Sequence, residues 1–294
     1  MPFTLSHAAA VLPGLRRDGT AHGPLVASAL VMGSFSPDIT YFAASVVPEA
    51  MAWGDFTHGL IGLLTVDVLV TALLVGLWWV VRDPLLALLP PPLHLRVRAW
   101  LTGPAIRWGP SYLVRFFVSA VIGAATHIFW DSFTHEGRWG TRMVPVLAET
   151  VGGFGVHKFA QYGSSAIALL VIGAFVVSAL SQQPVPPPNS RPPHTAPRWR
   201  PVDRRTRRTV CLALLAFALC GALHRCIVLY RSWDGDLSPI DLIPTACFGA
   251  GTGWAVGVLL YAVVARLAST AHTPMDLAHA DPDEPEPSRR GGRL

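Results

Sequence analysis

The chain has 294 residues, of which 51% are hydrophobic and 14% are charged, and its formal net charge is +5. Soluble domains carry about 25% charged residues, so the composition excludes an ordinary soluble enzyme and predicts a membrane protein. All basic residues except Lys158 are arginines that lie mostly between apolar runs, without the basic surface of a nucleic-acid module. We therefore expect no nucleic-acid partner, and we interpret the net charge as membrane topology.

The first 47 residues predict a short helix followed by a broken apolar run. Residues 3–15 are typical of an amphipathic helix that Thr4 or Ser6 could cap. No charged start or cleavage site of a secretory signal is present, so this segment should remain on the mature protein. The apolar run at about 25–47 is interrupted at Pro37, which disfavours helix at the preceding residue. A break at membrane depth must line a cavity or be buried in protein, so Asp38 is the first candidate site residue.

Five longer apolar runs each provide the roughly 20 residues that a bilayer requires. They predict an all-α polytopic membrane protein with about five or six membrane-embedded helices. The runs lie at about 58–81, 112–131, 159–180, 210–230 and 243–267. Four cysteines fall in the last two runs without a CxxC spacing, and we expect buried free thiols: Cys211, Cys220, Cys226 and Cys247.

Composition divides the chain into four regions. A membrane unit covers 1–181, a Pro- and Arg-rich linker 182–208, a C-terminal transmembrane hairpin 209–268, and a disordered tail 269–294. The positive-inside rule places the Arg-rich loop that follows the 58–81 run, the linker and the tail in the cytoplasm. The start of that run and the end of the next one then lie at the external membrane face.

The richest group of candidate ligands ends the run at 112–131. His127, Asp131 and His135 are spaced i, i+4 and i+8, which places them within an arc of about 80° on a helix. Imidazole nitrogens and carboxylate oxygens are ligands for zinc-like divalent ions. Antiparallel packing brings His58 to the same membrane face. The mixed set that suits one or two such ions comprises His7, Asp38, His58, His127 and Asp131.

The alternative interpretation is that these polar residues cap helices or contact interfacial lipid and water. For an isolated His58 this alternative is favoured. For His127, Asp131 and His135 together the functional interpretation is favoured, because ionisable groups inside a membrane are costly. His135 is the weakest ligand and is expected to act as a base or substrate contact. We expect Asp67 to contact another helix, and His224 to be a satisfied buried histidine.

Several short motifs together carry a resemblance to an uncharacterised family of bacterial integral membrane proteins, over about residues 1–181. They are the MPFT start with Ser6-His7-Ala8-Ala9, Gly33-Ser34 to Pro37-Asp38, Phe56-Thr57-His58, Thr126-His127 with Trp130-Asp131 and Thr134-His135, and Gln161-Tyr162-Gly163-Ser164. The pattern is more remotely similar to membrane-bound metal-dependent hydrolases and zinc-dependent phospholipase C. This resemblance implies a bacterial cytoplasmic membrane location, zinc as the metal, and ligands at His7, Asp38, His58, His127 and Asp131.

Residues 25–47 could either cross the membrane fully or enter and leave it on the same side. If they cross the membrane fully, His7 starts on the side away from the other candidate ligands. A re-entrant path brings His7 and Asp38 to the external site but leaves Arg16 and Arg17 outside, against the charge rule. We favour the re-entrant path, because the break at Asp38 needs a cavity in either case.

Two functions of different classes follow. The favoured hypothesis is a metal-dependent hydrolase acting on a lipid phosphoester at the membrane, with His135 as the base. The alternative is a non-catalytic membrane protein, a transporter or assembly partner, whose polar residues line a path or bind a structural metal.

Overall fold

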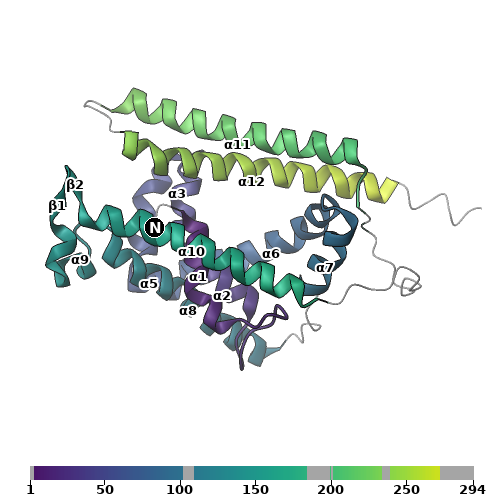
Figure 1. The fold of residues 1–294 in the computed structure, drawn as a ribbon, viewed down its shortest axis with the longest axis horizontal. Helices are drawn as coiled ribbons and strands as arrows, with labels where there is room; N and C mark the ends of the chain where they lie inside the picture. The colour runs from purple at the N-terminus through teal and green to yellow at the C-terminus, as the bar shows by residue number, and fades with distance from the viewer. Residues whose placement is uncertain (1–2, 102–108, 184–198, 200, 234–238, 272–294) are drawn as a thin grey trace, which may run out of the picture.

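The structure is a computed structural model, and it describes residues 3–101, 109–183, 199, 201–233 and 239–271 (Figure 1). Helices dominate it, and its strands are two short antiparallel partners, β1 and β2. This confirms the predicted all-α class. The short elements outside the core of the fold are η4 Pro48–Trp53, α7 Pro91–Leu101, α9 Trp139–Met143, η5 Pro145–Ala148, β1 Thr150–Val151 and β2 Phe154–Gly155.

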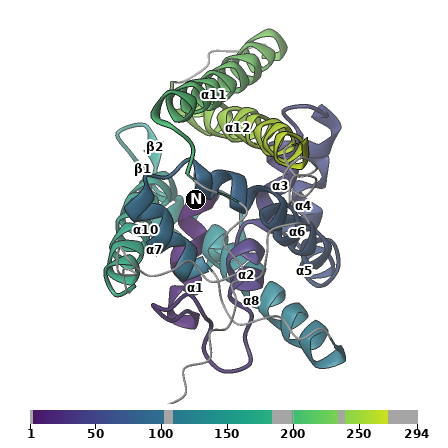
Figure 2. The same cartoon turned by 90° about the vertical axis from the view of Figure 1, so that its right-hand side faces the viewer.

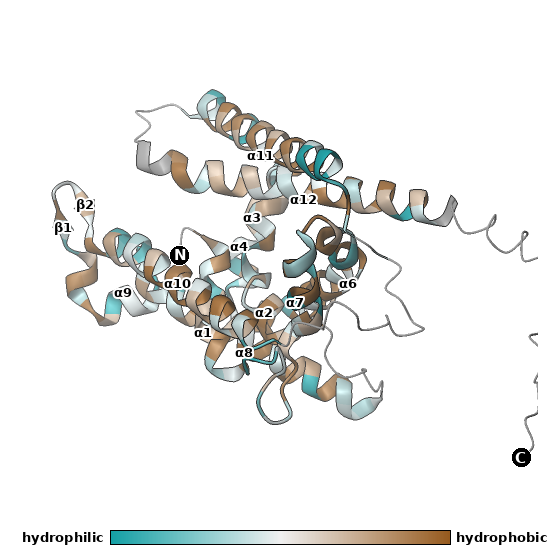
Figure 3. Ribbon diagram, turned by 45° about the vertical axis from the view of Figure 1, so that its right-hand side comes forward, coloured by the Kyte–Doolittle hydropathy of each residue, from teal (hydrophilic) through white to brown (hydrophobic). Residues whose placement is uncertain are grey.

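Five helices are long and apolar enough to cross a membrane, as the five apolar runs predict. Their outward surfaces carry large exposed hydrophobic side chains, and hydrophobic residues recur along their lengths (Figure 3). The chain is therefore a membrane protein. The five helices are α6 Val66–Ala87, α8 Pro110–Thr134, α10 Val156–Ser181, α11 Arg204–Ser232 and α12 Pro239–Ala271.

The first of these spans begins later than its apolar run. The backbone of Thr65 leaves the helical region and separates α5 (Leu60–Leu64) from α6. Gly62 lies against the backbone of Phe56, where a side chain would overlap the Phe56 carbonyl, so the segment folds back closely on α4 (Gly54–Thr57). His58 consequently follows α4 and does not start the span.

The N-terminal segment is helical throughout, as predicted, but its cap differs. It comprises η1 (Thr4–His7), α1 (Ala8–Val11) and η2 (Leu12–Gly14). Phe3 occupies the N-cap position and no side chain caps the helix, so the prediction of a Thr4 or Ser6 cap is wrong. The Thr4 hydroxyl instead bonds to Asp38, because the two segments pack together.

The predicted break in the apolar run at 25–47 is confirmed. The run forms α2 (Ala27–Gly33), η3 (Ser36–Asp38) and α3 (Ile39–Ala43). Helices of seven and five residues are too short to cross a bilayer. The segment is re-entrant in form, since α2 packs against α8 and the chain then turns away through η3.

The position of the loop with Arg16 and Arg17 removes the conflict between the full crossing and the re-entrant path of residues 25–47. After η2 the chain reaches the N-terminal part of α8, where Arg115 Nε donates to the Pro24 carbonyl at 2.5 Å. Gly19 adjoins Trp100 of α7, in the Arg-rich loop region. The two arginines therefore lie at the α7 end of the molecule although His7 lies at the opposite end of α8. Because α1 and η2 carry the chain from one end of α8 to the other before α2 begins, His7 can lie beside the other candidate ligands while Arg16 and Arg17 lie at the end that the charge rule favours.

The hairpin of α11 and α12 lies along one face of the other helices, with α11 outermost (Figures 1 and 2). Asp203 caps α11 by accepting from the Thr206 amide at 2.9 Å, so the helix starts inside the predicted linker. Val202 packs against a buried cluster that joins residues of α11 and α12 to Val81 of α6 and to Leu88 just after it, so the hairpin is held at the end of α6. The rest of the linker up to residue 200, apart from 182, 183 and 199, and the tail after 271 lie outside the described residues.

The prediction of buried thiols in this hairpin is wrong. All four cysteines are free, but Cys211 and Cys220 are exposed and Cys226 and Cys247 are half-buried. His224 is exposed as well, which overturns its prediction as a buried histidine. The reason is that α11 packs on the protein through one face, so the rest of its apolar surface faces outward.

Candidate metal centre

Four side chains from three separate segments converge on one point inside the unit. Asp38 comes from η3, His58 from the end of α4, and His127 and Asp131 from one face of α8. One ligand atom of each lies within 4.8 Å of one atom of every other. The i, i+4 spacing on α8 places His127 and Asp131 on one face, as the sequence predicts. His58 meets them from the end of α4 and not from the start of a span.

Both imidazoles are oriented by backbone carbonyls. His58 Nδ1 donates to Gly54 O and His127 Nδ1 donates to Ser34 O, each at 2.8 Å. A carbonyl only accepts hydrogen bonds, so Nδ1 carries the hydrogen and a neutral ring presents the lone pair of Nε2. This is the arrangement in which metal-ligating histidines are held. Ser34 contributes through its carbonyl because the chain breaks just after α2.

The distances between these groups fit a shared cation. His127 Nε2 lies 3.4 Å from both Asp38 Oδ1 and Asp131 Oδ2, and His58 Nε2 lies 3.8 Å from the same two oxygens. Ligand atoms around a tetrahedral zinc with bonds of about 2.1 Å are ~3.4 Å apart. His127 Nε2 is buried and makes no hydrogen bond to a described residue. The donor set and its spacing therefore suit a divalent ion.

The Asp38 carboxylate is fixed from its far side. Thr4 Oγ1 donates to Asp38 Oδ2 at 2.5 Å, while Oδ1 faces the two imidazoles. Burial by itself raises the pKa of Asp38, but the His127 imidazole outweighs it and holds the pKa below its ordinary value. Asp38 is therefore a carboxylate at neutral pH, as a ligand must be.

His7 lies beside the cluster and is not one of its four converging groups. Its ring stacks on His127 with the centroids 3.5 Å apart, and Nε2 is 3.4 Å from Asp131 Oδ1. Neither ring nitrogen makes a hydrogen bond to a described residue. Burial, and then the neighbouring His127, lowers the pKa of His7 well below its ordinary value, so the ring is neutral. Its role as a further ligand stays a prediction.

His135 lies at the open side of the cluster. It follows the last turn of α8, and its side chain is 40% exposed whereas that of Asp131 is 8% exposed. Its Nδ1 lies 3.2 Å from the Asp131 carbonyl and its Nε2 lies 3.0 Å from Gln161 Nε2 on α10. Burial lowers the pKa of His135, although Asp131 counteracts this effect. A neutral imidazole at the mouth of the site can accept a proton, as the predicted base requires.

Three further residues border the site, and no sequence pattern marked them as site residues. Tyr41 packs against His58 with the ring centroids 5.7 Å apart, and burial raises its pKa to about 12. Arg138 pairs with the exposed Asp55 at 3.0 Å near the mouth. Thr4 is the third, and its contact with Asp38 joins residues that are 34 positions apart.

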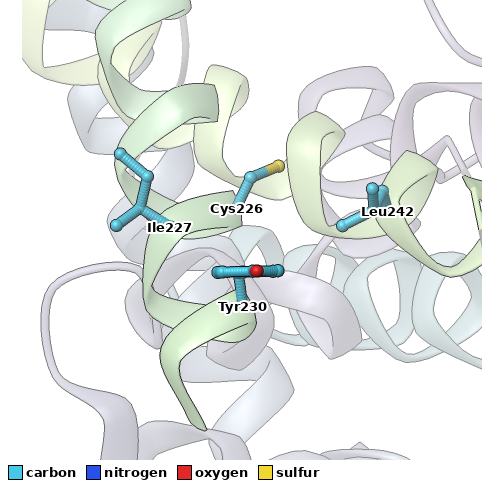
Figure 4. A pocket seen from close by; sticks show the side chains of 4 residues that line it. All are labelled: Cys226, Ile227, Tyr230 and Leu242. Atoms are coloured by element: carbon cyan, nitrogen blue, oxygen red, sulfur yellow. The ribbon is translucent and has the colours of Figure 1, made fainter. Parts of the chain in front are cut away.

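A buried carboxylate, Asp67, and an apolar hollow in the C-terminal hairpin lie outside this cluster. Asp67 is fully buried at the start of α6, and neither carboxylate oxygen hydrogen-bonds a described residue. An apolar hollow of about 390 Å³ lies between α11 and α12 (Figure 4). Its lining comprises Cys226, Ile227, Tyr230 and Leu242. No member of the His/Asp cluster lines the hollow, so it is separate from the candidate metal centre.

One comparison with known proteins gives a match. A family model described as a domain of unknown function, DUF4184, matches residues 1–263. The match extends beyond residue 181, where the resemblance in the sequence was expected to end, and takes in most of the C-terminal hairpin. No curated protein and no solved structure matches the chain.

Proposed function

Since the chain belongs to the DUF4184 family of unknown function, we propose from its site that it is a membrane-embedded metal-dependent hydrolase acting on a lipid phosphoester. The proposed metal is zinc, with Asp38, His58, His127 and Asp131 as ligands and His7 beside them. The observation that carries the proposal is the convergence of two carbonyl-tethered imidazoles on two carboxylates.

A metal-free ion-pair cluster is the competing explanation of the same residues. A protonated imidazole would donate Nε2–H to a carboxylate at about 2.7–2.9 Å. The nitrogen-to-oxygen distances of 3.4–3.8 Å are longer, and buried His127 Nε2 makes no hydrogen bond to the described chain. Spacing of this kind supports an ion shared between the four groups.

The chemistry divides between the ion and the residues around it. A bound divalent ion polarises a phosphoryl or carbonyl oxygen and lowers the pKa of water. His135, neutral and half-exposed, accepts a proton at the mouth, with its ring held near the Asp131 carbonyl. Gln161 supports this orientation from α10. The four ligands and Thr4 keep the site rigid, which positions the reacting groups.

The surface around the mouth supports a lipid substrate. Large apolar side chains are exposed on elements too short to span a membrane: Met51 and Trp53 on η4, Met143 on α9, and Val151 and Phe154 on the β hairpin. Such side chains are stabilised at the lipid interface, where an amphipathic molecule would be presented to the site.

Charge near the mouth supports an anionic head group. Arg138 can exchange its exposed partner Asp55 for a phosphate, because exposed ion pairs contribute little. Arg16 and Arg17 lie at the α7 end, away from the site. With the positive-inside rule, this supports our proposal that the metal centre faces the outside of a bacterial cytoplasmic membrane.

The alternative is a non-catalytic protein with a structural metal, a transporter or an assembly partner. Burial favours it, because the side chains of Asp38, His58 and His127 are at most 5% exposed. The test is hydrolysis of phosphoester lipids in mixed micelles by the zinc-loaded protein and by its His135→Gln variant. Hydrolysis that falls in the variant while zinc is retained supports the enzyme. A zinc-loaded parent that hydrolyses none of them contradicts the hydrolase.

A further inference from the structure

An arginine in a membrane-spanning helix points at the segment that carries Asp38. The Arg225 side chain of α11 donates through Nη1 to the Tyr41 carbonyl and to Ser45 Oγ, the latter at 2.6 Å. Its guanidinium also lies 5.6 Å from the centroid of the Phe248 ring on α12. A charged residue at membrane depth is costly and marks a functional role when its partner is specific.

The second helix of the hairpin, α12, contacts the same segment around Phe42 and Ser45. Thr252 Oγ1 of α12 lies 2.8 Å from the Phe42 carbonyl and 3.2 Å from Ser45 Oγ. The Phe42 ring fills the space beside Gly251 that a side chain would need, and it meets Phe248 edge-on with centroids 5.0 Å apart. Two helices thus provide polar donors and a fitted apolar surface to one short helix.

That short helix, α3, cannot hold its position alone. It has five residues, too few for independent stability, and backbone amides just past its end bond to the Thr40, Phe42 and Ala43 carbonyls. Arg225 donates to the Tyr41 carbonyl, and Thr252 adds a second donor to the Phe42 carbonyl beside the Ser45 amide. The positive charge of Arg225 at the C-terminal end of α3 also interacts favourably with the helix dipole. Asp38 is the residue at the other end of α3, so a shift of α3 displaces its carboxylate.

We propose that the C-terminal hairpin is a clamp on the metal centre, in which Arg225 and Thr252 are positioning residues that hold α3 and thereby Asp38. Tyr41 is held by the same contact, with its carbonyl bound to Arg225 and its ring against His58. The inference rests on the proposed metal function and assigns a role to a hairpin that contributes no ligand to the cluster.

The chain supplies a matched control. Arg266 of α12 also donates to backbone carbonyls of the membrane unit, to Val80 at 2.6 Å and to Trp79 at 3.2 Å. These carbonyls belong to α6, far from α3 in the sequence and outside the metal cluster. Loss of either arginine weakens hairpin attachment, but only loss of Arg225 releases the segment with Asp38.

The experiment compares Arg225→Ala, Arg225→Lys, Thr252→Val and Arg266→Ala in the full-length protein. Zinc affinity is measured by chelator competition, the ligand geometry by Co²⁺ absorption, and α3 mobility by hydrogen exchange over residues 39–45. We expect Arg225→Ala to lower zinc affinity about tenfold or more and to alter the Co²⁺ spectrum. Arg225→Lys should recover part of both, Thr252→Val should show a smaller change, and Arg266→Ala should match the parent.

The experiment distinguishes failure of the proposed clamp from failure of the proposed metal function. Equal zinc affinity and equal Co²⁺ spectra in Arg225→Ala and Arg266→Ala overturn the clamp while leaving the metal function intact. A parent that binds no metal overturns the proposed function, and the positioning role with it. Unchanged exchange over 39–45 in Arg225→Ala overturns the clamp whether or not metal binds.

Discussion

Replacing Thr4 by valine tests the metal centre through one hydroxyl. The substitution keeps the branched shape of a buried side chain and removes the donor that lies 2.5 Å from Asp38 Oδ2. A hydrogen bond to a charged partner contributes about 1.5–3 kcal/mol, which is roughly 10- to 150-fold in an equilibrium constant. Because this bond orients a ligand, we expect Thr4→Val to lower zinc affinity by about 10- to 100-fold without losing a ligand.

The assay is chelator competition on the full-length protein in detergent, with melting temperature measured in parallel. Thr20→Val is the matched control, since Thr20 Oγ1 donates to Asp18 Oδ1 at 2.7 Å in an exposed loop. The control should bind zinc with parent affinity. A Thr4→Val protein that binds zinc as tightly as the parent refutes the assignment of Asp38 as a ligand oriented by Thr4.

Other substitutions separate ligand, packing and catalytic roles. His127→Ala removes a ligand and the bond to the Ser34 carbonyl, so we expect the purified variant to lose its metal by mass-spectrometric analysis; full retention would contradict the role. Gly123→Ala places a methyl group against the Leu30 carbonyl and forces α2 from α8, so the protein should lose about 1–3 kcal/mol of stability and bind zinc more weakly. Gly76→Ala, which meets open space, should change neither, and an equal effect of both would refute the packing argument. His135→Gln should keep the metal and lower hydrolysis by about 10²- to 10⁴-fold, and unchanged turnover would remove it as the base.

The parts of the fold that follow from local patterns were predictable. Apolar runs of sufficient length indicate spans because a bilayer requires them, and the break at Pro37 follows from its missing donor. His127 and Asp131 share a helix face by spacing alone. The apolar pattern could not locate the start of α6, because the bend at Thr65 depends on Gly62 packing against Phe56.

The parts that depend on contacts between distant segments were not predictable. The sequence analysis kept His7 and Arg16 on the same side of the membrane, so the ligand argument and the charge rule conflicted. Only the structure shows that the chain between them runs along α8 and places them at its opposite ends. In a membrane protein, the faces toward lipid and toward protein are both apolar. Composition therefore could not show that Cys211 faces outward or that Arg225 faces the carbonyls of α3.

The metal content of the purified parent protein decides whether the His/Asp cluster binds an ion. The full-length chain would be purified without chelator and analysed for bound metals by mass spectrometry against its protein concentration. The geometry of Asp38, His58, His127 and Asp131 predicts at least one divalent ion per chain, retained through extensive dialysis. A parent protein without stoichiometric metal, even after incubation with zinc, would contradict the proposed centre.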